Sequence, residues 1–67
     1  NYIHIELSSE EKIKTVELIN IQGKVISTMY GSSSTKLDFP VSNIKNGFYL
    51  LKVTANNGIQ TGKIIIE

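Results

Sequence analysis

Hydrophobic and polar residues alternate along much of the chain, which is typical of β-strands with one face buried and the other in water. In the segment 2–8 the apolar residues share one face, and they are Ile3, Ile5 and Leu7. In the segment 14–20, Val16 and Leu18 occupy the face that we expect to point inward. The pattern therefore predicts a half-buried strand in each segment.

Four later segments continue the strand pattern. The residues 24–30 form the next strand, and 35–39 form a short one that ends at Pro40 or lies at a sheet edge, because proline has no backbone N–H. The residues 47–55 are rather apolar on both faces, which indicates a central strand, and 59–66 form its return strand. In these segments we expect the following residues to face inward: Leu37, Phe39, Tyr49, Leu51 and Val53.

Turn residues separate the predicted strands. Gly23 fits a short hairpin connection in which glycine adopts a positive φ and forms a bulge. The dipeptide Asn57-Gly58 is a strong signal for a two-residue hairpin turn. Gly47 is also interpreted as a residue that the backbone geometry requires, and the residues 31–34 are a loop by composition. The residues 41–46 are predicted to form a turn segment anchored by Ile44.

A helix over residues 9–22 is the competing interpretation of the second strand. Ser8 and Glu11 have the spacing of a helix capping box. The segment is rich in β-branched residues, however, which lose side-chain freedom in a helix and suit a pleated sheet. The strand interpretation is therefore favoured, and the helix stays open as an alternative.

Six short strands separated by turns predict an all-β fold, a small antiparallel β-sandwich of the immunoglobulin-like type with six to seven strands. The chain has 67 residues, of which 40% are hydrophobic and 19% charged, so it has room for one globular domain spanning residues 1–67. It begins with Asn1, which suggests a fragment of a longer protein. The net charge of +1 argues against an electrostatic nucleic-acid binder.

The residues offer little catalytic chemistry. The chain has no cysteine and one histidine, His4, which lies on the polar face of its strand and is expected to be a surface residue. A metal site or a catalytic base would need partner groups that the sequence does not place nearby. We therefore predict a non-enzymatic module without a cofactor or a metal. Tyr2, Tyr30 and Phe48 are the aromatic residues expected to be exposed.

Three segments together resemble a known family. The residues 16–26 (VELINIQGKVI) resemble the V-x-I-Y-D-x-x-G-K-x-V segment of the type A C-terminal sorting domain of the type IX secretion system. The residues 37–53 resemble its L-D-V-S-x-L-x-x-G-x-Y-x-x-K-V segment, and 57–66 resemble its terminal G-x-x-x-x-K-I-I strand. The resemblance covers nearly the whole chain in the family's order. Asn20 stands where the family more often has aspartate.

The resemblance implies a function in protein transport in Bacteroidetes-type bacteria. Domains of this family follow an N-terminal cargo domain and direct it from the periplasm across the outer membrane. The implied partners are the outer-membrane translocon and shuttle proteins of the type IX system. A cell-surface sortase commonly removes the domain and attaches the cargo to the cell surface. The implied localisation is the periplasm in transit, then the cell exterior or surface.

The last strand is the part for which we expect a recognition role. If the strand 59–67 lies at a sheet edge, its free backbone groups could pair with a strand of a receptor. The residues expected to take part in recognition are Gly58, Lys63, Ile64, Ile65 and Ile66. The competing interpretation is that two of the three isoleucines belong to the core and the third covers it. An accessory immunoglobulin- or fibronectin-like spacer, with or without carbohydrate binding, is the rival function.

Overall fold

The computed structural model describes residues 1–8, 10–32 and 34–67. Strands make up most of these residues, and none of them is helical. The segment that could have been a helix contains a strand instead, although Ser9, where that helix would begin, lies outside the described residues. The strands are β1 (Tyr2–Glu6), β2 (Ile13–Asn20), β3 (Val25–Tyr30), β4 (Lys36–Pro40), β5 (Gly47–Ala55) and β6 (Gly58–Ile66).

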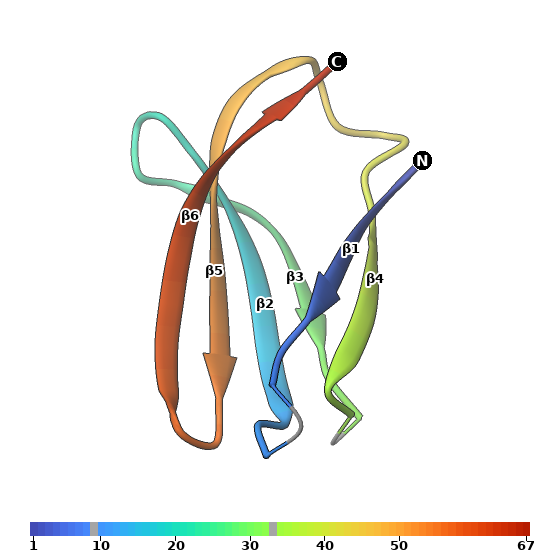
Figure 1. The fold of residues 1–67 in the computed structure, drawn as a ribbon. Helices are drawn as coiled ribbons and strands as arrows, with labels where there is room; N and C mark the ends of the chain where they lie inside the picture. Colours follow the sequence, from blue (N-terminus) through green and yellow to red (C-terminus); the bar gives the residue numbers. More distant parts are fainter. Residues whose placement is uncertain (9, 33) are drawn as a thin grey trace.

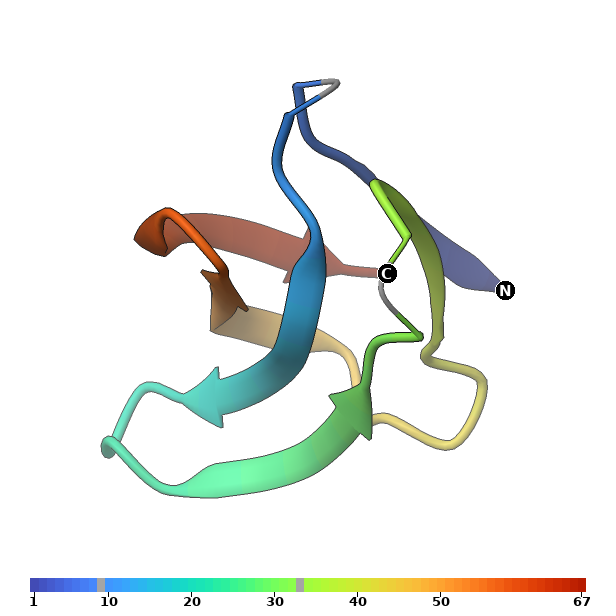
Figure 2. The same ribbon diagram turned by 90° about the horizontal axis from the view of Figure 1, so that it is seen from below.

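The six strands form two antiparallel sheets (Figure 1). One sheet pairs β1 with β4, and the other has the order β3-β2-β5-β6. Seen from below, the larger sheet curves around the interior and the smaller sheet lies on its open side (Figure 2). The predicted all-β sandwich is confirmed. As expected, β5 is a central strand, because it lies between β2 and β6.

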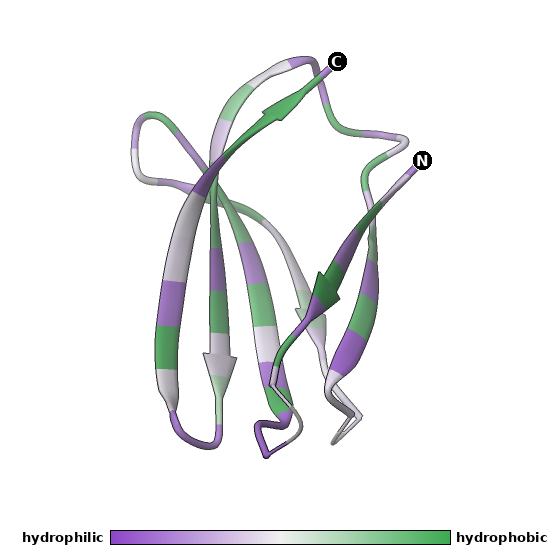
Figure 3. Cartoon of the chain, viewed as in Figure 1, coloured by the Kyte–Doolittle hydropathy of each residue, from purple (hydrophilic) through white to green (hydrophobic). Residues whose placement is uncertain are grey.

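The core lies between the two sheets. Most residues predicted to face inward are buried, and they include Phe39, which is 1% exposed. Val41 is also buried, although it was assigned only to a turn segment, because the turn after β4 folds back over the core. Alternating hydropathy along β2 and β5 is visible in Figure 3. The buried core residues are Ile5, Ile13, Val16, Leu18, Phe39, Val41, Leu51, Val53 and Ile66.

The β2–β3 connection, residues 21–24, is closed by Asn20. The Asn20 N–H donates to the Lys24 carbonyl (2.9 Å), and the Gly23 N–H donates to the Asn20 carbonyl (2.9 Å). Gly23 has a φ of +90°, as the hairpin prediction requires. The Asn20 side-chain oxygen also accepts the N–H groups of Gln22 (3.0 Å) and Lys24 (2.9 Å). An aspartate oxygen could accept the same two bonds, so the departure from the family pattern preserves the turn.

The β5–β6 turn lies one residue earlier than predicted. Ala55 pairs with Gly58, so the two turn residues are Asn56 and Asn57, and Gly58 is the first residue of β6, with a φ of +144°. The Asn56 side-chain oxygen accepts the Lys12 N–H (2.7 Å), and the Asn56 N–H donates to the Lys12 carbonyl (3.1 Å). These two bonds hold Asn56 in the turn and tie the turn to the start of β2.

Gly31 occupies a place that no other residue could fill without a shift of the backbone. Its N–H donates to the Lys14 carbonyl at 2.8 Å, just after β3 ends. A Cβ at this position would lie 2.1 Å from the Ile13 carbonyl oxygen. No sequence pattern indicates this close approach, because a glycine next to serines is equally common in an unconstrained loop.

Candidate functional site

Strand β6 forms one edge of the four-stranded sheet. It pairs with β5 on one side, and no strand of the described chain pairs with its other side (Figure 1). Its nine residues run opposite β5 in unbroken register, from the pair Ala55–Gly58 to the pair Gly47–Ile66. The edge is therefore long and regular.

The alternation of an antiparallel ladder determines which backbone groups of β6 are free. The pair Ala55–Gly58 closes a two-residue turn, and such a closing pair is hydrogen-bonded. Every second residue of β6 from Gly58 onward then bonds to β5. The residues between them direct their N–H and C=O groups away from β5, and they are Ile59, Thr61, Lys63 and Ile65. These groups form a row that another strand could pair with.

The three isoleucines predicted for recognition lie on different faces. Ile66 is 8% exposed and belongs to the core, and Ile64 is partly buried against it. Ile65 points the opposite way and is 60% exposed. The structure thus places two isoleucines at the core, as the competing interpretation expected, and leaves Ile65 on the outer face.

Apolar side chains gather on the outer face of the sheet next to this edge. Ile65 lies opposite Phe48, which is 68% exposed. Leu50 follows on β5, and Ile21, in the β2–β3 turn, is 81% exposed. We call these four residues the outer patch. Together with Tyr49 and Lys63, three of them line an open hollow. Ile21 could not be assigned to this face from the sequence, because strand alternation does not say where the side chain of a turn residue points.

The charges of the outer face are arranged unevenly. In the middle of this face, the Nζ of Lys52 lies 3.7 Å from a carboxylate oxygen of Glu17. Lys63 is exposed and pairs across the ladder with Leu50, and it makes no ion pair with any described residue. The predicted recognition residue Lys63 is thus a free cation beside the outer patch, while Gly58 lies at the opposite end of the strand.

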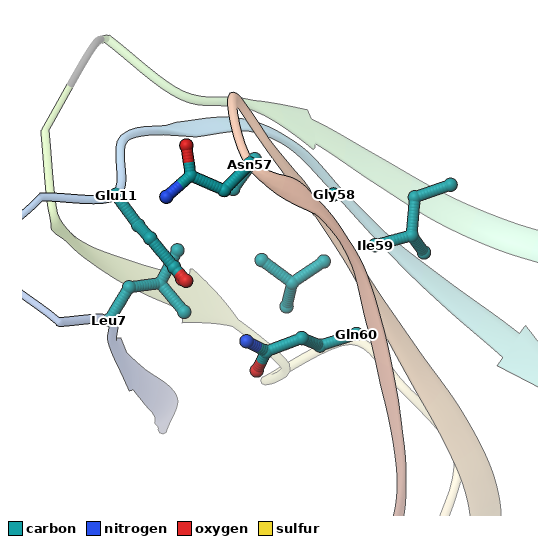
Figure 4. A pocket seen from close by; sticks show the side chains of 8 residues that line it. Leu7, Glu11, Asn57, Gly58, Ile59 and Gln60 are labelled. Carbon is teal, nitrogen blue, oxygen red and sulfur yellow. The ribbon is translucent and has the colours of Figure 1, made fainter.

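A second hollow lies near the β5–β6 turn. Leu7, Glu11 and Gln60 surround it, while Ile59 points away from it (Figure 4). Its lining contains one carboxylate and no histidine, so it holds no acid–base or nucleophile–base pair.

The other candidate groups are dispersed. His4 is 80% exposed, and its Nδ1 lies 2.5 Å from an Asp38 carboxylate oxygen on the neighbouring strand β4. In the part of the chain that the structure describes, no three histidine, cysteine or acidic side chains are grouped to hold a metal ion. Those residues also contain no helix that could cross a membrane. Gly47, with a φ of +153°, begins β5, and Asn57 lies in the turn before β6.

The exposed aromatic rings do not form a binding platform. Tyr2 lies on β1, in the smaller sheet. Tyr30 and Phe48 both lie on the larger sheet, but at opposite ends of it. Tyr30 is level with Thr15 and Thr54, near the end of β5, whereas Phe48 is near the start of β5. A carbohydrate-binding spacer would need rings side by side, and this arrangement does not supply them.

One of the comparisons with known proteins identifies a family for this chain. The family model described as "Secretion system C-terminal sorting domain" matches residues 1–67, the whole chain. No curated protein and no solved structure matches the chain significantly. Domains of this family interact with the type IX secretion machinery, and their cargo is secreted or displayed at the cell surface. The chain therefore belongs to the secretion system C-terminal sorting domain family and is a sorting signal for type IX secretion.

Proposed function

We propose that this chain directs a cargo domain from the periplasm through the outer-membrane translocon. The cargo domain precedes it in the same polypeptide, and β6 is the strand that the machinery recognises. Translocon and shuttle proteins of the type IX system are the proposed partners. After export, a cell-surface sortase removes the domain and attaches the cargo to the surface. In this proposal the domain acts as a folded label and carries out no reaction itself.

The observation that carries the proposal is the unpaired edge of β6. Four residues along it present free N–H and C=O groups, and the strand has no proline and no bulge to prevent pairing. When a partner strand adds to such an edge, main-chain hydrogen bonds supply affinity and the side chains beside them supply specificity. The outer patch and Lys63 lie where such specificity contacts would form.

Replacing Thr61 with proline tests this proposal. The Thr61 N–H points away from β5, so Thr61→Pro removes a donor from the free edge without removing a bond to β5. Truncating residues 62–67 would be less informative, because it also removes Ile66 from the core. The assay measures export of a reporter fused in front of the chain in cells with a type IX system.

Thr28→Pro is the matched control. Thr28 lies on β3, at the other edge of the same sheet, and ladder alternation also directs its N–H outward. We expect Thr61→Pro to reduce export at least about tenfold, while Thr28→Pro leaves it near the unmodified level. Circular dichroism verifies that both variants are folded. Unchanged export of folded Thr61→Pro would refute the recognition of β6.

A further inference from the structure

Gly62, in the middle of β6, has no structural reason to be glycine. Its φ is not in the positive region, and a Cβ added to it would meet no atom within 4 Å. Glycine within a strand weakens the strand, because it loses more backbone entropy on folding and packs no side chain. The fold alone would thus favour a larger residue at this position.

The missing side chain leaves a hollow on the inner face of the sheet. Gly62 pairs with Leu51, and the hollow beside it is bounded by Leu51, Val53, Gln60 and Ile64. Leu51 and Val53 form its apolar floor, and both are almost buried. The hollow lies along the edge strand, so a side chain can reach it from outside the domain.

A strand added to β6 would bring a side chain to this hollow. In the antiparallel ladder, the partner residue opposite Gly62 belongs to a non-hydrogen-bonded pair, with Cα atoms about 4.5 Å apart. Its side chain would stand on the inner face. A large apolar or aromatic side chain there covers the glycine and packs on the floor, which is the way cross-strand aromatic residues compensate for edge glycines.

We propose that the partner of β6 is a protein strand that places a large apolar side chain, best an aromatic ring, over Gly62. On the outer face, the same strand carries an acidic residue opposite Lys63, because opposite charges are favourable across strands and Lys63 has no counter-charge of its own. This inference rests on the proposed recognition of β6 and specifies the chemistry of the partner strand.

The charge of β6 favours such a partner over a second copy of this chain. Lys63 is the single charged residue between Gly58 and Ile66. If two copies paired along the length of β6, each would offer no acid to the Lys63 of the other. Neither would offer an aromatic side chain, because the strand contains none.

Gly62→Val separates the recognition role from a purely structural one. Valine suits a strand and would cover Leu51 and Val53, so we expect the melting temperature to rise by about 4–8 °C. The same side chain fills the hollow, so export of a fused reporter is expected to fall by about tenfold. Thr28→Val is the control, since it puts a β-branched aliphatic residue on β3, at the other edge of the sheet, and should leave export unchanged.

Two synthetic peptides test the partner chemistry directly. One has the sequence Val-Ser-Glu-Phe-Thr-Ser-Val, which in antiparallel register puts Phe opposite Gly62 and Glu opposite Lys63. The other has Ala in place of Phe. We expect the Phe peptide to shift the amide NMR signals of β6 and to bind about tenfold more tightly than the Ala peptide. A third peptide, with Lys in place of Glu, should bind more weakly than the first.

Several outcomes would overturn the inference. Equal affinity for the Phe and Ala peptides, or no shift of the β6 signals with either, would contradict a specific place for the ring. Normal export of a stabilised Gly62→Val variant would do the same. If Thr61→Pro blocks export in that case, the recognition of β6 stands and only the partner chemistry is wrong. Self-association through β6, measured by sedimentation, would favour the second copy instead.

Discussion

The two edges of the larger sheet differ in how open they are to another strand. β3 has six residues and carries a bulge: Leu18 pairs with Ser27 and Ile19 with Val25, so Ile26 is an extra residue. β6 has nine residues in unbroken register. Bulges and short length are common ways of keeping an edge strand from pairing with other chains. The sheet is thus protected at β3 and open at β6, which favours β6 as the recognition edge.

The difference extends to the ends of the two strands. β3 starts after a turn that Asn20 holds with both its backbone and its side chain, and it is followed by Gly31, which lies against Ile13. β6 starts at a two-residue turn and ends with Ile66 in the core, while its middle residues are exposed. Substitutions that loosen β3 or remove the charge of β6 test whether the two edges differ in this way.

Gly31→Ala should have the largest effect on stability. The added Cβ would lie 2.1 Å from the Ile13 carbonyl oxygen, so the backbone must move and the end of β3 loosens. We expect a loss of about 2–3 kcal/mol in the free energy of unfolding, measured with urea. Gly62→Ala is the control, because no atom lies within 4 Å of the new Cβ. Equal stability of the two variants would contradict the close approach at Gly31.

Asn20→Ala should have an intermediate effect. It leaves the Gln22 and Lys24 N–H groups without their side-chain acceptor, although water can replace part of it at this exposed turn. The expected loss is about 1 kcal/mol, with faster amide exchange in β3 than in β6. Asn20→Asp retains the acceptor and should keep most of the stability. If Asn20→Asp lost as much stability as Asn20→Ala, the side-chain acceptor would not be what holds the turn.

Lys63→Ala should have the smallest effect on folding and a visible effect on solubility. Lys63 is exposed and unpaired among the described residues, so the free energy of unfolding should change by less than about 0.5 kcal/mol. Its removal leaves β6 without a charge, and edge lysines oppose aggregation. Light scattering should therefore detect more aggregation than in Lys24→Ala, a change in the β2–β3 turn. Equal scattering would show that β6 is less open than its geometry suggests.

The strands and their inward faces could be predicted from the sequence because alternation reports directly on one buried face. Val16, Leu18 and Phe39 are examples, and all three are buried. The sequence predicts the turn before β6 one residue too late. The position of this turn depends on two hydrogen bonds between Asn56 and Lys12. Such contacts join residues 44 apart and leave no local pattern. The same reason explains why Gly31 was not recognised as a packing residue.

The candidate site was predictable only in part. The terminal strand was expected to carry recognition, but its place at an edge depends on the order of strands, which long-range pairing decides. Ile64, Ile65 and Ile66 could be expected to alternate between faces, whereas only the structure shows that Ile65 is the outward one. The hollow at Gly62 needed the register with Leu51, which no sequence pattern reveals.

The pairing of β1 with β4 has a kinetic consequence. Tyr2 lies opposite Pro40, so the smaller sheet forms only after a loop of many residues has closed. Ile66, near the end of the chain, completes the core. Such distant contacts give a high contact order and folding times of about milliseconds to seconds. The core can therefore be completed only after β6 has been made.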